Sequence, residues 1–425
     1  MKKILIVIIT FLFIASSLGI AQDRRLGYDG YLRSAKIYLQ LTPKDYKKAA
    51  EMLEAAIKYY PDQPPIEAHY VLGTIYADKN LFEEMRKEFE YVLTICDTAQ
   101  SEDIQDECDK EDYVENIQDV LASKWIQQYN NGVSTLKRAR DQDASCEPIE
   151  DSILKAECDS TAMDLYMRAA ESFQISTMIL PDSAQGWINL GLIYYSIDST
   201  DKALSFYQEA LQINDQDLSL LSNMFSIYFN TGQYDSAIAI GKKMMELELT
   251  PQSRADMLYN MSIGYNALDE IDSAIVYLKK SIEITPDSPD ALYNLGAFII
   301  KSAADLVNKL GELQDSVEVN AAKYEPIRDS INQEVKVKYR EAADVFEQCV
   351  ELDPDNMEAL DWLGQAYFFL EEWDKSKEVS LKIIDLEPEN EDAWCQLLII
   401  YLKENNKEKI QEAREHCTRY DKKKQ

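Results

Sequence analysis

A pattern of large and small residues recurs along this chain at intervals of about 34 residues. Its clearest copy consists of Trp187, Leu190, Gly191 and Tyr194, followed by Ala203, Tyr207 and Ala210. Related copies contain Leu221, Leu258, Leu292 and Leu360, and weaker ones contain His69 and Trp394. Spacings of three and four place these residues on one face of a helix. A period of this length predicts stacked helix pairs, each of which buries its apolar face against the next.

The pattern resembles the tetratricopeptide repeat, W-x2-L-G-x2-Y followed by A-x3-F and P. The resemblance implies an all-α fold, an α-solenoid of about nine helix pairs that extends over residues 22–425. The repeats are expected at about 31–61, 66–96, 125–181, 185–216, 219–250, 255–287, 289–355, 357–389 and 391–420.

Three segments depart from the period. Acid-rich insertions are expected at 97–122 and 141–161. The interval from Gly296 to Ala342 is 46 residues, whereas the corresponding interval from Gly191 to Ala203 is 12. Apolar residues continue at helical spacing through the surplus, which predicts an extended helical hairpin over 300–340 with its turn near residues 324–326. Its apolar seam serves either to hold the two arms together or to form a docking or dimerisation element.

The first residues indicate where the protein is located, and its net charge limits the partners that it can bind. Residues 1–21 contain Lys2 and Lys3, an apolar run and a small-residue end at Ala21, which is typical of a cleaved secretory signal. An uncleaved membrane anchor is the alternative. We therefore expect an exported protein, periplasmic or envelope-associated, without stable membrane insertion after cleavage. A formal net charge of -32 argues against nucleic-acid binding, which requires clustered basic residues.

Seven cysteines in an exported chain favour disulfides. Cys96 and Cys108 are 12 residues apart, as are Cys146 and Cys158, and each pair flanks or lies within an insertion. We predict these two bridges. Cys349 occupies a small-residue position where a buried thiol suffices, and whether Cys395 and Cys417 are bridged stays open at this point.

The sequence does not carry the signatures of catalysis. It lacks G-x-S-x-G, H-E-x-x-H and a phosphate-binding glycine-rich loop, so we expect no enzyme activity and no cofactor. His69 and His416 lie in distant repeats, and no C-x2-C occurs, so we expect no metal site. Calcium binding by the acids near residues 103–112 is a minor alternative, because the loop lacks the D-x-D-x-D-G arrangement.

The resemblance also implies a binding surface, because the first helix of each tetratricopeptide repeat lines the concave face of the array. The sixth position of that helix is occupied by Asn130, Asn189, Asn223, Asn260 and Asn294, and neighbouring groove positions by Tyr195, Phe229, Tyr259 and Tyr293. A row of carboxamides supplies both donors and acceptors for the backbone of an extended peptide. Basic residues that clamp a terminal carboxylate in other members are absent from the second position, where Gln185, Ser219, Asp256 and Asp290 stand.

These features predict a non-enzymatic scaffold that binds an extended, basic segment of another protein in its groove. The alternative is a structural subunit of a cell-envelope assembly that contacts its partners through the projecting hairpin and the outer surface. Fold alone does not decide between them.

Overall fold

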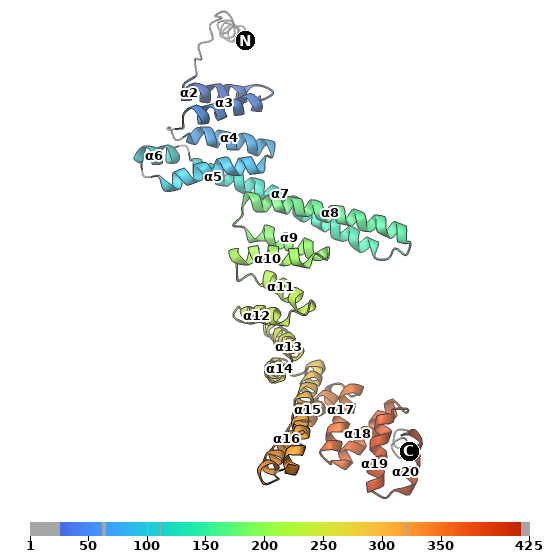
Figure 1. Cartoon of the computed structure of the whole chain (residues 1–425). Coiled ribbons are helices and arrows are strands. Elements are labelled where there is room, and N and C mark those ends of the chain that lie inside the picture. The colour runs from blue at the N-terminus through green and yellow to red at the C-terminus, as the bar shows by residue number, and fades with distance from the viewer. Residues whose placement is uncertain (1–25, 62–64, 100, 111, 320, 418–425) are drawn as a thin grey trace, which may run out of the picture. The chain divides into compact units, whose positions relative to one another are not determined.

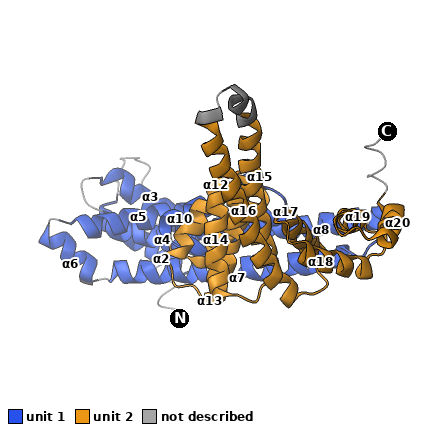
Figure 2. Ribbon diagram, turned by 90° about the horizontal axis from the view of Figure 1, so that it is seen from below, with its two compact units in different colours: residues 1–214 blue, residues 215–425 orange. Residues whose placement is uncertain are grey.

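The computed structural model describes residues 26–61, 65–99, 101–110, 112–319 and 321–417. All regular structure in this part of the chain is helical, with nineteen helices. The chain divides into two compact units, Met1–Asn214 and Asp215–Gln425, which are coloured separately in Figure 2. The predicted signal at 1–21 lies outside the described residues. Among the residues described, no helix combines the length and the apolar character needed to cross a membrane.

The first unit is a stack of antiparallel helix pairs with one additional short helix (Figure 1). Its helices are α2 (Tyr28–Gln40), α3 (Tyr46–Tyr59), α4 (Ile66–Lys79), α5 (Phe82–Thr98), α6 (Glu102–Lys110), α7 (Tyr113–Cys146), α8 (Ser152–Ile179), α9 (Ala184–Ser196) and α10 (Thr200–Ile213). The pairs are α2–α3, α4–α5, α7–α8 and α9–α10.

The second unit contains five such pairs in its described residues. Its helices are α11 (Leu218–Asn230), α12 (Tyr234–Met245), α13 (Pro251–Ala267), α14 (Ile271–Ile284), α15 (Pro289–Val319), α16 (Ala321–Leu352), α17 (Met357–Phe369), α18 (Trp373–Leu386), α19 (Glu391–Lys403) and α20 (Lys407–His416). The predicted all-α solenoid of about nine helix pairs is confirmed.

Local signals set where the helices begin and where each pair turns. The side chains of Asp217, Asn356 and Asn390 each accept a hydrogen bond from a backbone N–H in the first turn of the helix that follows. Left-handed residues separate the two helices of a pair at Asn80, Asp198, Gly232, Asp269, Glu371 and Asn405. Four of these six are Asn or Asp and one is Gly, the residue types that adopt this conformation most readily.

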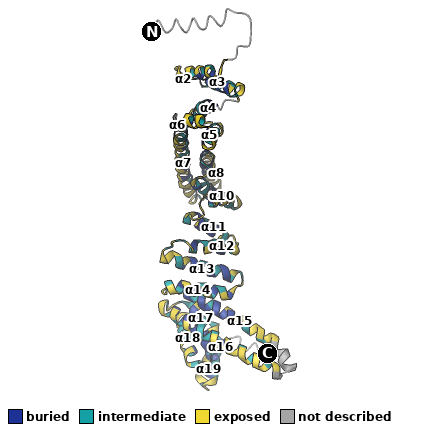
Figure 3. Ribbon diagram, turned by 90° about the vertical axis from the view of Figure 1, so that its left-hand side faces the viewer, coloured by how far each residue is buried: buried dark blue, intermediate teal, exposed yellow. Residues whose placement is uncertain are grey.

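A glycine of the first helix faces an aromatic ring of the second helix in several pairs. A Cβ on Gly296 would lie 2.5 Å from Cζ of Phe346, and a Cβ on Gly132 would lie 2.9 Å from the Phe173 ring. The rings of Phe173 and Phe346 are fully buried. Burial is concentrated where neighbouring helices face each other, and the outward faces are exposed (Figure 3). The small residue is therefore required so that the two helix backbones can approach across the ring.

The two acid-rich segments are largely helical. The first contains α6, the short link after it and the first turns of α7. In the second, α7 continues to Cys146 and α8 begins at Ser152, so only a short turn separates them. The second segment thus lengthens both helices of a pair instead of inserting a loop between them. Acidic side chains on the exposed faces of these helices remain in water, so an acid-rich segment can still be helical.

The predicted extended hairpin is formed by α15 and α16. These helices have 31 and 32 residues, more than twice the 14 of α14, and they project beyond the neighbouring helices of their unit (Figure 2). Ile299, Ala303, Val335 and Ala342 are buried along the seam. The expected turn near residues 324–326 is wrong, because α15 ends at Val319 and Pro326 lies inside α16. Pro326 lies in the second turn of α16, where it lacks the N–H that would otherwise bond to the carbonyl of residue 322.

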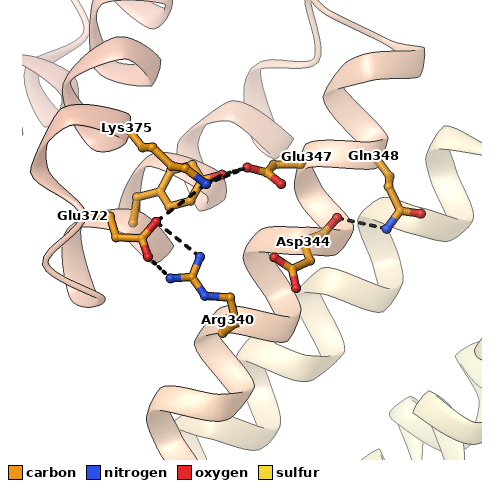
Figure 4. A network of polar contacts seen from close by, with 7 residues as sticks. Arg340, Asp344, Glu347, Gln348, Glu372 and Lys375 are labelled. Carbon is orange, nitrogen blue, oxygen red and sulfur yellow. Dashed lines mark hydrogen bonds and ion pairs between the residues drawn. The ribbon is translucent and has the colours of Figure 1, made fainter.

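A network of charged side chains ties the base of the hairpin to the next pair (Figure 4). Arg340 of α16 pairs with Glu372, which precedes α18, and Lys375 Nζ lies 3.3 Å from Glu347 Oε1 and 3.7 Å from Glu372 Oε2. Tyr367 Oη donates to Glu347. One lysine thus bridges two acids from different segments, so the network links α16 to the start of α18.

Three disulfides lie in the described residues. Cys96–Cys108 and Cys146–Cys158 have Cα–Cα distances of 5.8 and 5.6 Å, and a third bridge joins Cys395 to Cys417. Cys349 is a buried free thiol whose pKa is raised by burial. The first bridge ties the end of α5 to α6, and the second closes the turn between α7 and α8.

Removing the bridge at the end of the α7–α8 pair is expected to destabilise that pair. The change Cys146→Ser with Cys158→Ser should lower the free energy of local unfolding of this pair by about 2 kcal/mol, because the bridge closes a short loop. The effect should be local, because the end of the pair can unfold while the rest of the stack stays folded. Hydrogen exchange should show faster exchange in α8 from Ser152 onward. A control variant, Cys349→Ser, removes a thiol that forms no bridge and should leave exchange in α8 unchanged. Equal protection of α8 from hydrogen exchange in both variants would contradict a stabilising role of the Cys146–Cys158 bridge.

Candidate functional site

The five carboxamides of the predicted row all lie on first helices of their pairs. Asn130 in α7 and Asn189 in α9 belong to the first unit, and Asn223 in α11, Asn260 in α13 and Asn294 in α15 belong to the second. Asn130 is exposed, and the other four are half-buried. The structure therefore provides two separate parts of the row, one in each unit.

Two of these asparagines connect consecutive first helices. Asn189 Nδ2 donates to Tyr129 Oη at 3.3 Å and to the carbonyl of Gln185 at 2.8 Å. Asn294 Nδ2 donates to Tyr259 Oη at 2.8 Å. In each case the tyrosine stands one residue before the asparagine of its own repeat, at Tyr129–Asn130 and Tyr259–Asn260. These two amides have a structural role that sequence reasoning missed, and the preceding tyrosine was the available signal.

Asn223 and Asn260 line a hollow of about 560 Å³ between α11 and α13. Neither carboxamide makes a side-chain hydrogen bond within the part of the chain that the structure describes. The other lining residues are four apolar ones, Leu218, Met244, Leu249 and Met257, three serines, Ser219, Ser222 and Ser253, and Asp256. The hollow thus combines an apolar wall with two amides that retain both donors and acceptors.

A second hollow, of about 680 Å³, lies between α13 and α15 and shares Asp256 with the first. Asp256, Asp287 and Asp290 line it, and no Lys, Arg or His is among the lining residues. Tyr259 also lines it, and burial together with the charge of Asp290 raises the pKa of its hydroxyl. The second hollow therefore carries uncompensated negative charge next to an aromatic ring.

The remaining predicted groove residues have mixed environments. Tyr195 of α9 is exposed. Phe229 packs against Phe225 and Tyr234, with ring centroids 5.7 and 5.5 Å apart. Tyr293 lies 6.3 Å from the ring of Phe346, and burial, followed by the charge of Glu358, raises its pKa. Phe229 and Tyr293 therefore contribute chiefly to packing between helices.

Both histidines take part in packing contacts. His69 stacks on Tyr91 at 3.9 Å, and its Nδ1 lies 2.5 Å from Glu88 Oε2. His416 stacks on Trp394 at 4.4 Å. The acids of residues 102–110 lie on helix α6, and no cluster of three metal-ligating side chains occurs in the residues described.

The paired helices, the glycine–aromatic contacts and the row on the first helices define an α-solenoid of helix hairpins. The tetratricopeptide repeat family matches three segments, residues 29–62, 184–217 and 255–288, which correspond to the pairs α2–α3, α9–α10 and α13–α14. The chain is a tetratricopeptide repeat protein.

Curated relatives are similar only over parts of their length. The protein is 22% identical to the Protein CTR9 homolog of Arabidopsis thaliana over 54% of this chain and 19% of that one. It is 22% identical to the human Protein O-mannosyl-transferase TMTC3 over 54% of this chain and 25% of that one. It is 26% identical to the Photosystem I assembly protein Ycf3 of Rippkaea orientalis over 31% of this chain and 65% of that one. The chain spans a quarter or less of the length of the first two relatives.

Solved structures of tetratricopeptide repeat proteins also resemble parts of the chain. YrrB, described as a TPR protein with an unusual peptide-binding site, is 19% identical and covers 53% of this chain and 96% of its own, with a TM-score of 0.38. MamA is 18% identical and covers 49% of this chain and 94% of its own, with a TM-score of 0.36.

Proposed function

We propose that this protein is a non-enzymatic scaffold that binds an extended segment of another protein along the first helices of its second unit. Tetratricopeptide repeats are, as a class, protein-interaction scaffolds. The observation that carries the finer proposal is the pair of free carboxamides, Asn223 and Asn260, in a hollow that adjoins an acidic one. Asn130 and Asn189 of the first unit belong to the same predicted row, and their part in binding stays a prediction.

The chemistry of the two hollows describes the segment that fits. The amides can bond the backbone of an extended peptide whatever its side chains, while the apolar wall takes a Leu-like or Met-like side chain. Asp256, Asp287 and Asp290 favour Lys or Arg in the neighbouring hollow. The proposed ligand is therefore an extended segment that combines basic and apolar residues.

The test uses the full chain and two synthetic peptides of about 12 residues, long enough to extend about 40 Å. One repeats Leu-Ser-Lys-Thr, and the other replaces each Lys with Glu. Fluorescence anisotropy should show at least about tenfold weaker binding of the Lys peptide to the variant Asn223→Ala with Asn260→Ala, because two hydrogen-bonded amides are lost. The Glu peptide should bind at least tenfold more weakly than the Lys peptide to the unaltered protein.

Asn308→Ala with Asn332→Ala is the matched control, because it removes two exposed amides from the α15–α16 hairpin. It should bind the Lys peptide as the unaltered protein does. The proposal is wrong if the Lys peptide does not bind, if both peptides bind equally, or if both double variants lose affinity to the same extent.

A second candidate is a structural role in a cell-envelope assembly through the projecting hairpin. The observation that favours it is apolar exposure outside the seam, where Val307 is 42% and Val337 is 54% exposed. Deletion of residues 304–338 should then release partners that the variant Asn223→Ala with Asn260→Ala retains. The opposite pattern would favour the scaffold that binds through its groove.

Export to an oxidising compartment belongs to the same proposal. Three cysteine pairs at bonding distance support it, because disulfides persist chiefly outside the reducing cytosol. Mass spectrometry of protein isolated without reductant from its own cells should find the six paired cysteines oxidised and Cys349 free.

A further inference from the structure

The outer face of α8 carries a stripe of exposed side chains that are apolar except for Ser160. Its members occur at alternating spacings of three and four residues: Ile153, Ala156, Ser160, Met163 and Met167. All five are exposed, and Ile153, at 70%, is the most exposed large hydrophobic residue in the described part of the chain. Met163 and Met167 are each 44% exposed. This spacing is that of the a and d positions of a coiled coil, so the five side chains form one seam along the helix.

The α7–α8 pair holds this stripe on a rigid support. The helix α8 has 28 residues against 14 for α10, and both members of the pair continue past the ends of α9 and α10 (Figure 1). The opposite face of α8 is buried against the rest of the unit through Leu165, Tyr166 and Ala169. Tyr166 Oη donates across the pair to Asp143 Oδ2 at 3.1 Å.

The end of the pair is also fixed. The Cys146–Cys158 bridge closes it, and the Asp151 carboxylate accepts hydrogen bonds from the backbone N–H groups of Ile153 and Leu154 at 2.9 and 3.0 Å. The exposed stripe therefore begins on an ordered, capped helix. A large apolar side chain held in water at such a position has no stabilising role in the unit, which indicates an interaction surface.

The charges beside the stripe are acidic. Glu157, Asp159 and Asp164 occupy the positions that flank a coiled-coil seam. Residues 141–164 contain eight acids and one base, Lys155. One of the acids, Asp164, pairs with Arg168 at 2.9 Å, and the flanks remain negative overall. This field repels anionic lipid and a second copy of the same stripe, and it attracts a helix with basic flanks.

We propose that the outer face of α8 docks an amphipathic helix of another protein whose apolar seam is flanked by Lys or Arg. The apolar seam supplies the contact area, and the acidic flanks select the partner and its register. This surface lies on the first unit and is independent of the groove proposed for the second.

The experiment uses the full, oxidised chain and three synthetic peptides of about 21 residues, or three heptads. The first has Leu and Ile at the seam and Lys at the flanking positions. The second has Glu in place of those Lys, and the third has the composition of the first in scrambled order. Fluorescence anisotropy at about 0.15 M salt should show binding of the first peptide at least about tenfold tighter than either of the others.

Two variants locate the binding. Met163→Glu with Met167→Glu should lose at least about tenfold in affinity for the Lys peptide, although it makes the protein more acidic. The matched control, Val276→Glu with Val337→Glu, adds the same charge at exposed apolar residues of the second unit and should retain the affinity. Glu157→Lys with Asp159→Lys should reverse the preference, so that the Glu peptide binds tighter than the Lys peptide.

Several results would overturn the proposal. They are equal binding of the ordered and scrambled Lys peptides, unchanged affinity of the Met163→Glu with Met167→Glu variant, or an unchanged preference after the charge reversal. Absence of peptide binding, together with a dimer that the same methionine variant abolishes, would assign the stripe to a second copy of this chain. Circular dichroism of each variant should match the unaltered protein, because every substituted side chain is exposed.

Discussion

Replacing Phe346 by alanine is expected to lower the free energy of unfolding of the second unit by about 4 kcal/mol. The Phe346 ring is fully buried, and it fills the space that Gly296 leaves on the facing helix. The helix backbones cannot collapse fully into that space, because buried residues such as Ile299 and Ala342 keep the rest of the α15–α16 seam packed. The loss can be measured by urea unfolding followed by circular dichroism.

Val337→Ala is the control for this change, because Val337 lies on the same helix and is 54% exposed. It should alter stability by less than about 0.5 kcal/mol. A cost below about 1 kcal/mol for Phe346→Ala would show that the base of the hairpin is loosely packed. The role assigned to the glycine–aromatic contact would then be wrong.

Replacing Gly191 by valine should destabilise the first unit by about 3 kcal/mol. A Cβ at this position would overlap the ring of Tyr207, which is fully buried and cannot move aside. Thermal and urea unfolding of the variant should both report the loss. In the background of Tyr207→Ala the same valine should cost much less, since the overlapping ring is gone, and this non-additivity is the decisive measurement.

Gly264→Ala provides the matched comparison within a helix. The nearest side-chain atom to a Cβ there is 3.4 Å away, on Ile238, which is ordinary contact. The gain in helix propensity from glycine to alanine, up to about 1 kcal/mol, should offset any adjustment of Ile238. Equal costs for Gly191→Val in the presence and absence of the Tyr207 ring would contradict the steric explanation.

The described residues form two candidate binding surfaces of different chemical character. In the second unit, polar groups line hollows between first helices, whereas in the first unit an apolar stripe lies on the outside of a long second helix. Both surfaces are bordered by carboxylates, so both proposals lead to basic partners. The peptides in the two experiments differ in conformation, extended in one and helical in the other, so each proposal can fail without the other.

The asparagine row shows why the repeat pattern alone could not identify the free amides. The sequence places Asn189, Asn223, Asn260 and Asn294 at equivalent positions. Only the stacking of successive pairs brings Tyr129 to Asn189 and Tyr259 to Asn294, which leaves Asn223 and Asn260 open. A hydrogen bond between residues 35 or 60 positions apart depends on the distance between repeats, which periodicity does not encode.

Spacing along the chain was enough to predict the helix pairs, the solenoid class and two cysteine pairs, because each of these follows from a local pattern. A glycine opposite an aromatic residue, or two cysteines twelve residues apart, constrains the fold locally. The turn of the α15–α16 hairpin, the continuity of α7 and α8, and the exposure of Met163 and Met167 could be seen only in the packed chain. These features depend on which helix faces are covered by neighbouring helices. Burial arises from contacts between helices, so the sequence of one helix does not predict it.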